Sequence, residues 1–187
     1  MTETVDSTHH LTPADLEAGL PTVRAAPRDE GVLELIIVRP DVGERRCLDE
    51  AELDLEEGVV GDRWRASGRS GGRPSNLDAQ VTLMSSRAAA LVARDRNRWP
   101  LAGDQLYVDL DLSGEHLPPG TRLAIGHAVL EVTAEPHTGC KKFTERFGLD
   151  AMRFVNSPEG RELNLRGINA RVVEPGTFRV GDAVRKL

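Results

Sequence analysis

The chain has 187 residues and a formal net charge of −6, so it can bury one sizeable core and is too acidic for a general binder of nucleic acid or anionic membrane. Residues 1–10 lack the apolar core of a signal peptide, and the longest apolar runs, around 32–38 and 88–93, are too short to cross a bilayer. We therefore expect a soluble, cytoplasmic, single-domain protein with no nucleic-acid or membrane partner, in which any basic site is local.

The N-terminal residues 1–30 are predicted to form a tail with one short helix. Thr12 is a good N-cap for that helix, Pro13 suits its first position, and Gly19 would end it. After these residues the chain becomes β-branched and apolar, and we expect residues 31–187 to form the domain.

Short apolar or alternating stretches, bounded by turn residues, predict many strands. They cover residues 32–38, 45–49, 80–84, 106–112, 122–125, 127–133, 168–173 and 178–184. Helices are expected from Ser86 to about Asn97 and, as two short segments, between residues 141 and 156. The pattern favours a mainly β fold, a closed β-barrel with a few short helices packed at its ends, over a doubly wound α/β sheet.

A basic, glycine-rich stretch runs from Ser67 to Ser75. It resembles a phosphate cradle only loosely, because it lacks the Gly-Lys-Ser/Thr ending of a P-loop. Two interpretations remain open for this stretch. It is a mobile surface loop, or it closes over an anionic ligand.

The segment around Cys140 carries the clearest chemical signal. An alternating run, Ala128 to Thr133, leads into it and an amphipathic run, Lys141 to Phe147, leads out, which places Cys140 where a strand hands over to a helix. A helix N-terminus and following lysines favour thiolate over thiol, the form that acts as a nucleophile or soft-metal ligand. The alternative is an inert, buried cysteine. The second cysteine, Cys47, is predicted to be a half-buried strand residue.

Several ordered motifs together resemble the MOSC family, named for the C-terminal domain of molybdenum-cofactor sulfurases. The resemblance covers roughly residues 31–187 and rests on Gly58–Trp64, Gly120–Gly126 with Ala128–Thr133, Cys140, Gly167–Val173, and Gly181-Asp182. It implies a strand-rich barrel of the pyruvate-kinase-barrel type. It also implies that Cys140 matches the key cysteine of the family, which carries sulfur as a persulfide in sulfurases and binds molybdenum in amidoxime-reducing relatives.

The chain departs from the family pattern in two places. Relatives often have Gly-Glu-Asn-Leu where this chain has Gly103-Asp104-Gln105-Leu106, and Arg-x-Pro-Cys where it has His137-Thr138-Gly139-Cys140. Any pyridoxal-phosphate association belongs to the desulfurase domain fused ahead of MOSC in full sulfurases, and the chain shows no Schiff-base lysine to support it.

The implied cofactor is molybdopterin with molybdenum, a pterin with a phosphate tail, so its pocket needs anion-binding groups beside a soft ligand. Cys140 is the expected metal ligand. The expected cofactor-binding residues are Arg63, Lys141, Arg166, Asn169 and Arg171. The alternative for each basic residue is a solvated charge, and for Asn169 a turn.

His137 is the second expected catalytic residue, beside Cys140. It would serve as a general acid or base, or hold Cys140 as thiolate; the alternative is a local hydrogen bond in the loop. Asp62 and Asp182 are interpreted as turn-forming residues rather than acids. No Ser-His-Asp order and no paired carboxylates stand out, so a hydrolase is unsupported.

Three functional hypotheses follow. The first is a protein that binds the molybdenum cofactor and uses Cys140 in sulfur transfer or in reduction of N-hydroxylated small molecules, with an external sulfur or electron donor protein. The second is a non-catalytic carrier of cofactor or metal. The third is a metal-free thiol-redox protein.

Overall fold

The computed structural model describes residues 10–68 and 75–187, and most of the predicted glycine-rich loop lies outside these residues. Seven strands form a closed barrel in the order β1, β11, β7, β8, β9, β5, β6, with β6 returning to β1. All of their pairings are antiparallel except β5 with β6. The predicted mainly β, barrel fold is therefore confirmed. The strand bounds are β1 Glu30–Val38, β5 Val81–Ser85, β6 Leu106–Asp109, β7 Arg122–Ile125, β8 Ala128–Val132, β9 Ile168–Glu174 and β11 Ala183–Lys186.

The inside of the barrel is filled by side chains. Alternate residues of a strand point to opposite faces, and the inward set includes Leu33, Leu83, Leu106 and Leu130, all completely buried. The interior is therefore a packed hydrophobic core.

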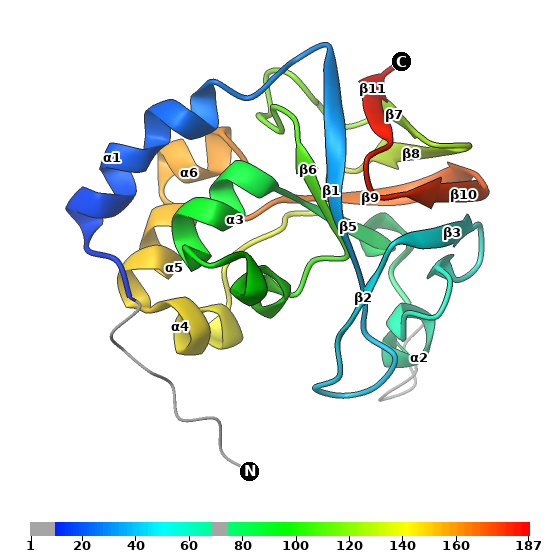
Figure 1. The fold of residues 1–187 in the computed structure, drawn as a ribbon, viewed down its shortest axis with the longest axis horizontal. Coiled ribbons are helices and arrows are strands. Elements are labelled where there is room, and N and C mark those ends of the chain that lie inside the picture. Colours follow the sequence, from blue (N-terminus) through cyan, green and yellow to red (C-terminus); the bar gives the residue numbers. More distant parts are fainter. Residues whose placement is uncertain (1–9, 69–74) are drawn as a thin grey trace.

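A smaller sheet and an added strand extend the barrel on the side opposite the main helices (Figure 1). Strand β2 (Arg46–Leu48) pairs with β1, while β3 (Glu50–Asp54), β4 (Gly58–Val59) and β10 (Gly176–Arg179) form a three-stranded sheet. Sequence patterning did not predict β3, because only Leu53 of its five residues is buried.

The helices gather mainly on one side of the barrel, with a second core beneath them (Figure 1). Met84 of β5 and Tyr107 of β6 point outward from the barrel into this core, where they meet Phe143 and Phe147. The helices are α1 (Pro13–Arg24), α2 (Trp64–Gly68), α3 (Ser86–Ala93), α4 (Lys141–Phe147), α5 (Leu149–Asn156) and α6 (Pro158–Glu162), with 3-10 turns η2 (Leu77–Ala79) and η3 (Arg96–Ala102).

Two helix ends differ from the sequence-based expectation, and the structure contains one helix that was not predicted. Helix α1 passes through Gly19, where a Cβ would lie 2.2 Å from Leu91 Cδ1, so the glycine permits close packing instead of ending the helix. Helix α3 ends at Ala93 rather than near Asn97, and the chain continues in η3. The segment 157–166 contains α6, which begins at the Ser157 N-cap. Among the helices of the described ranges, none is long and apolar enough to cross a membrane.

Candidate functional site

Cys140 lies at the start of helix α4 with its thiol exposed. The residue is the N-cap of α4 in an extended conformation, with φ −118° and ψ −179°, and its side chain makes no capping hydrogen bond. Asn156 of α5 fixes Gly139, the residue before Cys140. Asn156 Oδ1 accepts from Gly139 N at 2.9 Å, and Asn156 Nδ2 donates to Gly139 O at 3.1 Å. The interpretation of Cys140 as a buried cysteine is therefore wrong. Cys47 is a strand residue, as expected, but it is also exposed.

A cavity of about 350 Å³, here called the Cys140 cavity, opens beside this thiol. It is bounded by the turn between β1 and β2, the start of α2, the end of η3 and helix α4. Five basic residues line it, against two acidic ones, Asp41 and Glu44. The basic residues are Arg39, Arg45, Arg63, Lys142 and Arg146. Cys140 therefore faces a predominantly positive surface.

Two of the arginines that line the Cys140 cavity are held by hydrogen bonds within the protein, and a third, Arg63, is available to bind a ligand. Arg146 donates to Leu101 O at 2.7 Å, and Arg39 forms a two-pronged ion pair with Asp62. The side chain of Arg63, by contrast, makes no hydrogen bond or ion pair with any residue in the described ranges. Arg63 is thus free to bind an anion in the Cys140 cavity.

Asp62 organises the wall of the Cys140 cavity. Its side chain is fully buried and accepts hydrogen bonds from Arg39 N, Nε and Nη2 and from Trp64 N, each at 2.9 Å. Arg39 Nη1 continues the connection to Gly103 O at 3.0 Å. These contacts agree with the interpretation of Asp62 as a structural residue rather than a catalytic acid.

A buried carboxylate, Asp104, joins two of the predicted site residues. Asp104 Oδ1 lies 2.8 Å from His137 Nε2, and its Oδ2 accepts from Arg166 Nη1 at 2.6 Å. Burial raises the pKa of Asp104, but the charges and hydrogen bonds of Arg166 and His137 outweigh it and bring the pKa down to about 2. Arg166 also donates to Ala102 O at 2.8 Å and stacks 5.2 Å from the centre of the Phe143 ring. We call Asp104, His137 and Arg166 the Asp104 network.

Sequence reasoning did not select Asp104 as a site residue. It occupies the position where relatives often carry Glu, so the carboxylate is retained although the residue differs. The negative charge at this position was the feature that could have marked Asp104 as a site residue. The partners of Asp104 are 33 and 62 residues away in the sequence, so its pairing with them could not be predicted from local sequence.

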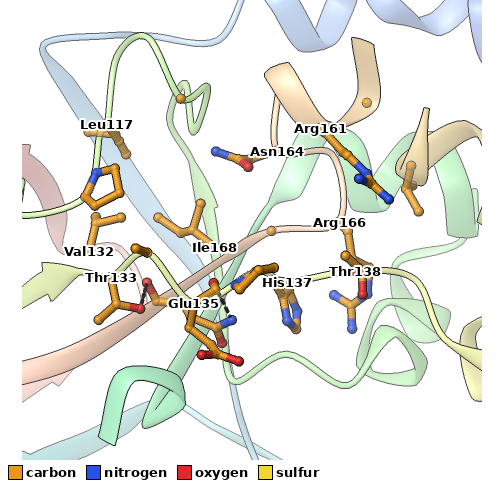
Figure 2. A pocket seen from close by; sticks show the side chains of 18 residues that line it. Leu117, Val132, Thr133, Glu135, His137, Thr138, Arg161, Asn164, Arg166 and Ile168 are labelled. Atoms are coloured by element: carbon orange, nitrogen blue, oxygen red, sulfur yellow. Dashed lines mark hydrogen bonds between the residues drawn. The ribbon is translucent and has the colours of Figure 1, made fainter. Parts of the chain in front are cut away.

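A second cavity, of about 320 Å³, is lined by two residues of the Asp104 network, His137 and Arg166. We call it the His137 cavity, and it shares no lining residue with the Cys140 cavity. Its polar lining includes His137, Thr138, Arg161, Asn164, Arg166 and Asn169 (Figure 2). Asn169 Nδ2 donates to Glu135 O at 3.1 Å and so fixes the loop that leads to Cys140.

The structure therefore divides the predicted site residues. Cys140 and Arg63 line the Cys140 cavity, whereas His137, Arg166 and Asn169 line the His137 cavity. The two remaining residues lie in neither lining: Lys141 is 91% exposed, 3.9 Å from Glu145, and Arg171 pairs with Glu131 at 2.5 Å. The structure adds Lys142 and Arg146, from α4, and Arg39 and Arg45, from the β1–β2 turn, to the surroundings of Cys140.

Comparison with known proteins identifies the class. The family model for the MOSC domain matches residues 69–185, more than half of the chain, and the chain therefore belongs to the MOSC domain family. No curated protein matches it.

Solved structures support the same fold. The structure is similar to that of YuaD from Bacillus subtilis, with a TM-score of 0.58 and 20% identity over 83% of this chain and 94% of that one. It is also similar to YiiM from Escherichia coli, with a TM-score of 0.54 and 19% identity over 83% and 69% of the chains. For YiiM from Geobacillus stearothermophilus the TM-score is 0.56, with 13% identity over 84% and 75%. At these identities the likeness concerns the fold.

Proposed function

We propose that the Cys140 cavity binds the molybdenum cofactor, and that Cys140 acts there as a metal ligand or as a carrier of sulfur. The observation that carries the proposal is an exposed thiol in a cavity lined by five basic residues, one of which, Arg63, has no side-chain partner within residues 10–68 and 75–187. Membership of the MOSC domain family supplies the choice of cofactor.

The residues of the cavity fit such a group in three respects. A thiolate sulfur is a soft ligand that suits molybdenum chemistry. The guanidinium of Arg63 suits two-pronged binding of a phosphate tail, with Lys142 adding positive charge. The cavity volume, about 350 Å³, lies within the range of small-molecule sites, roughly 300–1,000 Å³.

The protein's own residues would hold the thiol in place. Asn156 fixes Gly139, and the Asp104 network joins His137 to Arg166, so the segment 137–140 is tied at both ends. Arg166 also contacts Phe143 of α4, the helix that begins directly after Cys140. When bound, the cofactor would supply a metal centre for reduction of N-hydroxylated compounds or for acceptance of sulfur, with an external donor protein.

Molybdenum analysis of protein purified from a molybdenum-replete host tests the proposal. We expect about one molybdenum per chain in the wild type, in line with a single site. The metal should be lost in Cys140→Ser and retained in Cys47→Ser, which removes the other exposed thiol. Full retention in Cys140→Ser would contradict the role of Cys140 as metal ligand.

A second pair of variants tests the anion-binding role. Arg63→Gln should lower molybdenum content at limiting cofactor, whereas Arg65→Gln should not, because Arg65 pairs with Glu56 and does not line the cavity. Turnover of an N-hydroxylated substrate by the loaded protein would then separate an enzyme from a carrier.

The exposure of Cys140 also favours a second candidate, a metal-free thiol-redox protein. Metal-free protein in which Cys140 alkylates rapidly near neutral pH, and faster than Cys47, would favour this candidate over the first.

A further inference from the structure

The lining of the His137 cavity is polar on one side and largely apolar on the other. In Figure 2, Arg161, His137 and Thr138 lie on one side, while Leu117, Val132 and the polar Thr133 lie on the opposite side. Ile168 lies between the two groups in that view. A cavity of about 320 Å³ with this division suits a small molecule that has a polar end and an apolar body.

The polar side offers hydrogen-bond donors that lack acceptors. The Arg161 side chain makes no hydrogen bond or ion pair with the residues that the structure describes. Arg166, by contrast, is held by Asp104 and by the carbonyl of Ala102. A ligand that brings acceptor oxygens to Arg161 would form charge-assisted hydrogen bonds with it.

The charges around the cavity favour an anion of low charge. Arg166 is neutralised by Asp104, which leaves Arg161 as the unpaired cation in the described lining. Glu135 also lines the cavity and lies away from Arg161 in Figure 2. Its negative charge would repel an anion, and this repulsion grows with the number of charges on the anion. Inorganic phosphate would, in addition, leave the apolar side in contact with water.

We propose that the His137 cavity binds a small organic monocarboxylate with an apolar body. The carboxylate would pair with Arg161, while the body would pack against Leu117, Val132 and Ile168. This site is separate from the Cys140 cavity, because the two linings have no residue in common. The inference therefore does not depend on the function proposed for Cys140.

Titration of the full chain with cinnamate, followed by ligand-observed NMR, tests the site. We expect binding in the range of about 1 mM or tighter, and binding of the uncharged analogue cinnamyl alcohol at least about tenfold weaker. Arg161→Gln should weaken cinnamate binding at least about tenfold. The control Arg153→Gln should not change it, because Arg153 is an exposed arginine on α5 that lines neither cavity.

The inference is overturned by any of four results. These are no cinnamate binding at about 10 mM, equal affinity of the wild type and Arg161→Gln, inorganic phosphate binding as tightly as cinnamate, or loss of binding in Arg63→Gln with retention in Arg161→Gln. The last result would place the ligand in the Cys140 cavity instead. Retained binding in Cys140→Ser supports the site independently of any cofactor, and thermal melting of each variant confirms that it is folded.

Discussion

Replacing Asp104 by Asn tests whether the Asp104 network stabilises the fold around both cavities. The substitution keeps the size of the side chain and removes its negative charge. Arg166, whose side chain is only 7% exposed, would lose its counter-ion, and the contact with His137 Nε2 would weaken. We therefore expect Asp104→Asn to destabilise the protein strongly.

The lowered pKa of Asp104 indicates how much free energy of unfolding Asp104→Asn should lose. A pKa of about 2 in the folded protein, compared with the ordinary value of 3.8, corresponds to about 2 kcal/mol of stabilisation. Leaving one partner of a buried ion pair without its counter-charge costs about 3–5 kcal/mol. We expect Asp104→Asn to lower the free energy of unfolding by about 3 kcal/mol at neutral pH.

The sign of the pH dependence follows from the lowered pKa. The stabilisation by Asp104 is present above pH 3.8 and is lost as the pH falls from there towards about 2. About 1 kcal/mol of it should be lost by roughly pH 3. The difference in unfolding free energy between wild type and Asp104→Asn should therefore shrink as the pH is lowered from 7 to about 3.

Urea unfolding at both pH values measures this difference, with Asp109→Asn as the matched control. Asp109 forms an equally short ion pair, 2.6 Å from Arg87 Nε, but both side chains are about one quarter exposed, 27% and 26%. The control should cost no more than about 1 kcal/mol. Equal costs for the two variants, or a difference from wild type that does not change with pH, would refute the reasoning.

Three further predictions concern local contacts. Asn156→Ala removes both hydrogen bonds to Gly139, so it should speed amide hydrogen exchange at that residue; unchanged protection would show that the loop is held by other contacts. Gly19→Ala should change stability in thermal melts by less than about 1 kcal/mol, because the better helix propensity of alanine opposes the displacement of the flexible Leu91 side chain, whose Cδ1 would lie 2.2 Å from the new Cβ; with Leu91→Ala in the same chain the substitution should stabilise, and a destabilisation there would contradict this account. Tyr107→Phe should cost about 1–2 kcal/mol in urea unfolding, because the buried hydroxyl donates at 2.6 Å to a backbone carbonyl; a neutral effect would contradict that bond.

The strands of the barrel were predictable because their signal is local. In β1, β6 and β8, short apolar runs bounded by turn residues mark strands in which most side chains are buried. Strand β3 was missed because it buries a single side chain of its own, Leu53. Closure of the barrel pairs Glu30 with Arg185, and no local pattern specifies a pairing over that distance.

The candidate site was predictable at Cys140 and much less so around it. Strand-to-helix patterning indicated where the helix after Cys140 begins, and α4 does begin at Lys141. Nearness in sequence suggested Lys141 as a partner of the thiol. The helical period instead directs Lys141 to solvent beside Glu145, while Lys142 and Arg146, four residues apart, line the Cys140 cavity.

By itself, the sequence determined the class of fold and the position of Cys140 at the start of a helix, because alternation, turn residues and a helix start are properties of neighbouring residues. Only the tertiary structure decided which charges meet. It brought Arg63 to the Cys140 cavity, buried Asp104 between His137 and Arg166, and divided five of the seven predicted site residues between two separate cavities. Partners distant in sequence are selected by packing and by the need to neutralise a buried charge, and neither is written in a short stretch of chain.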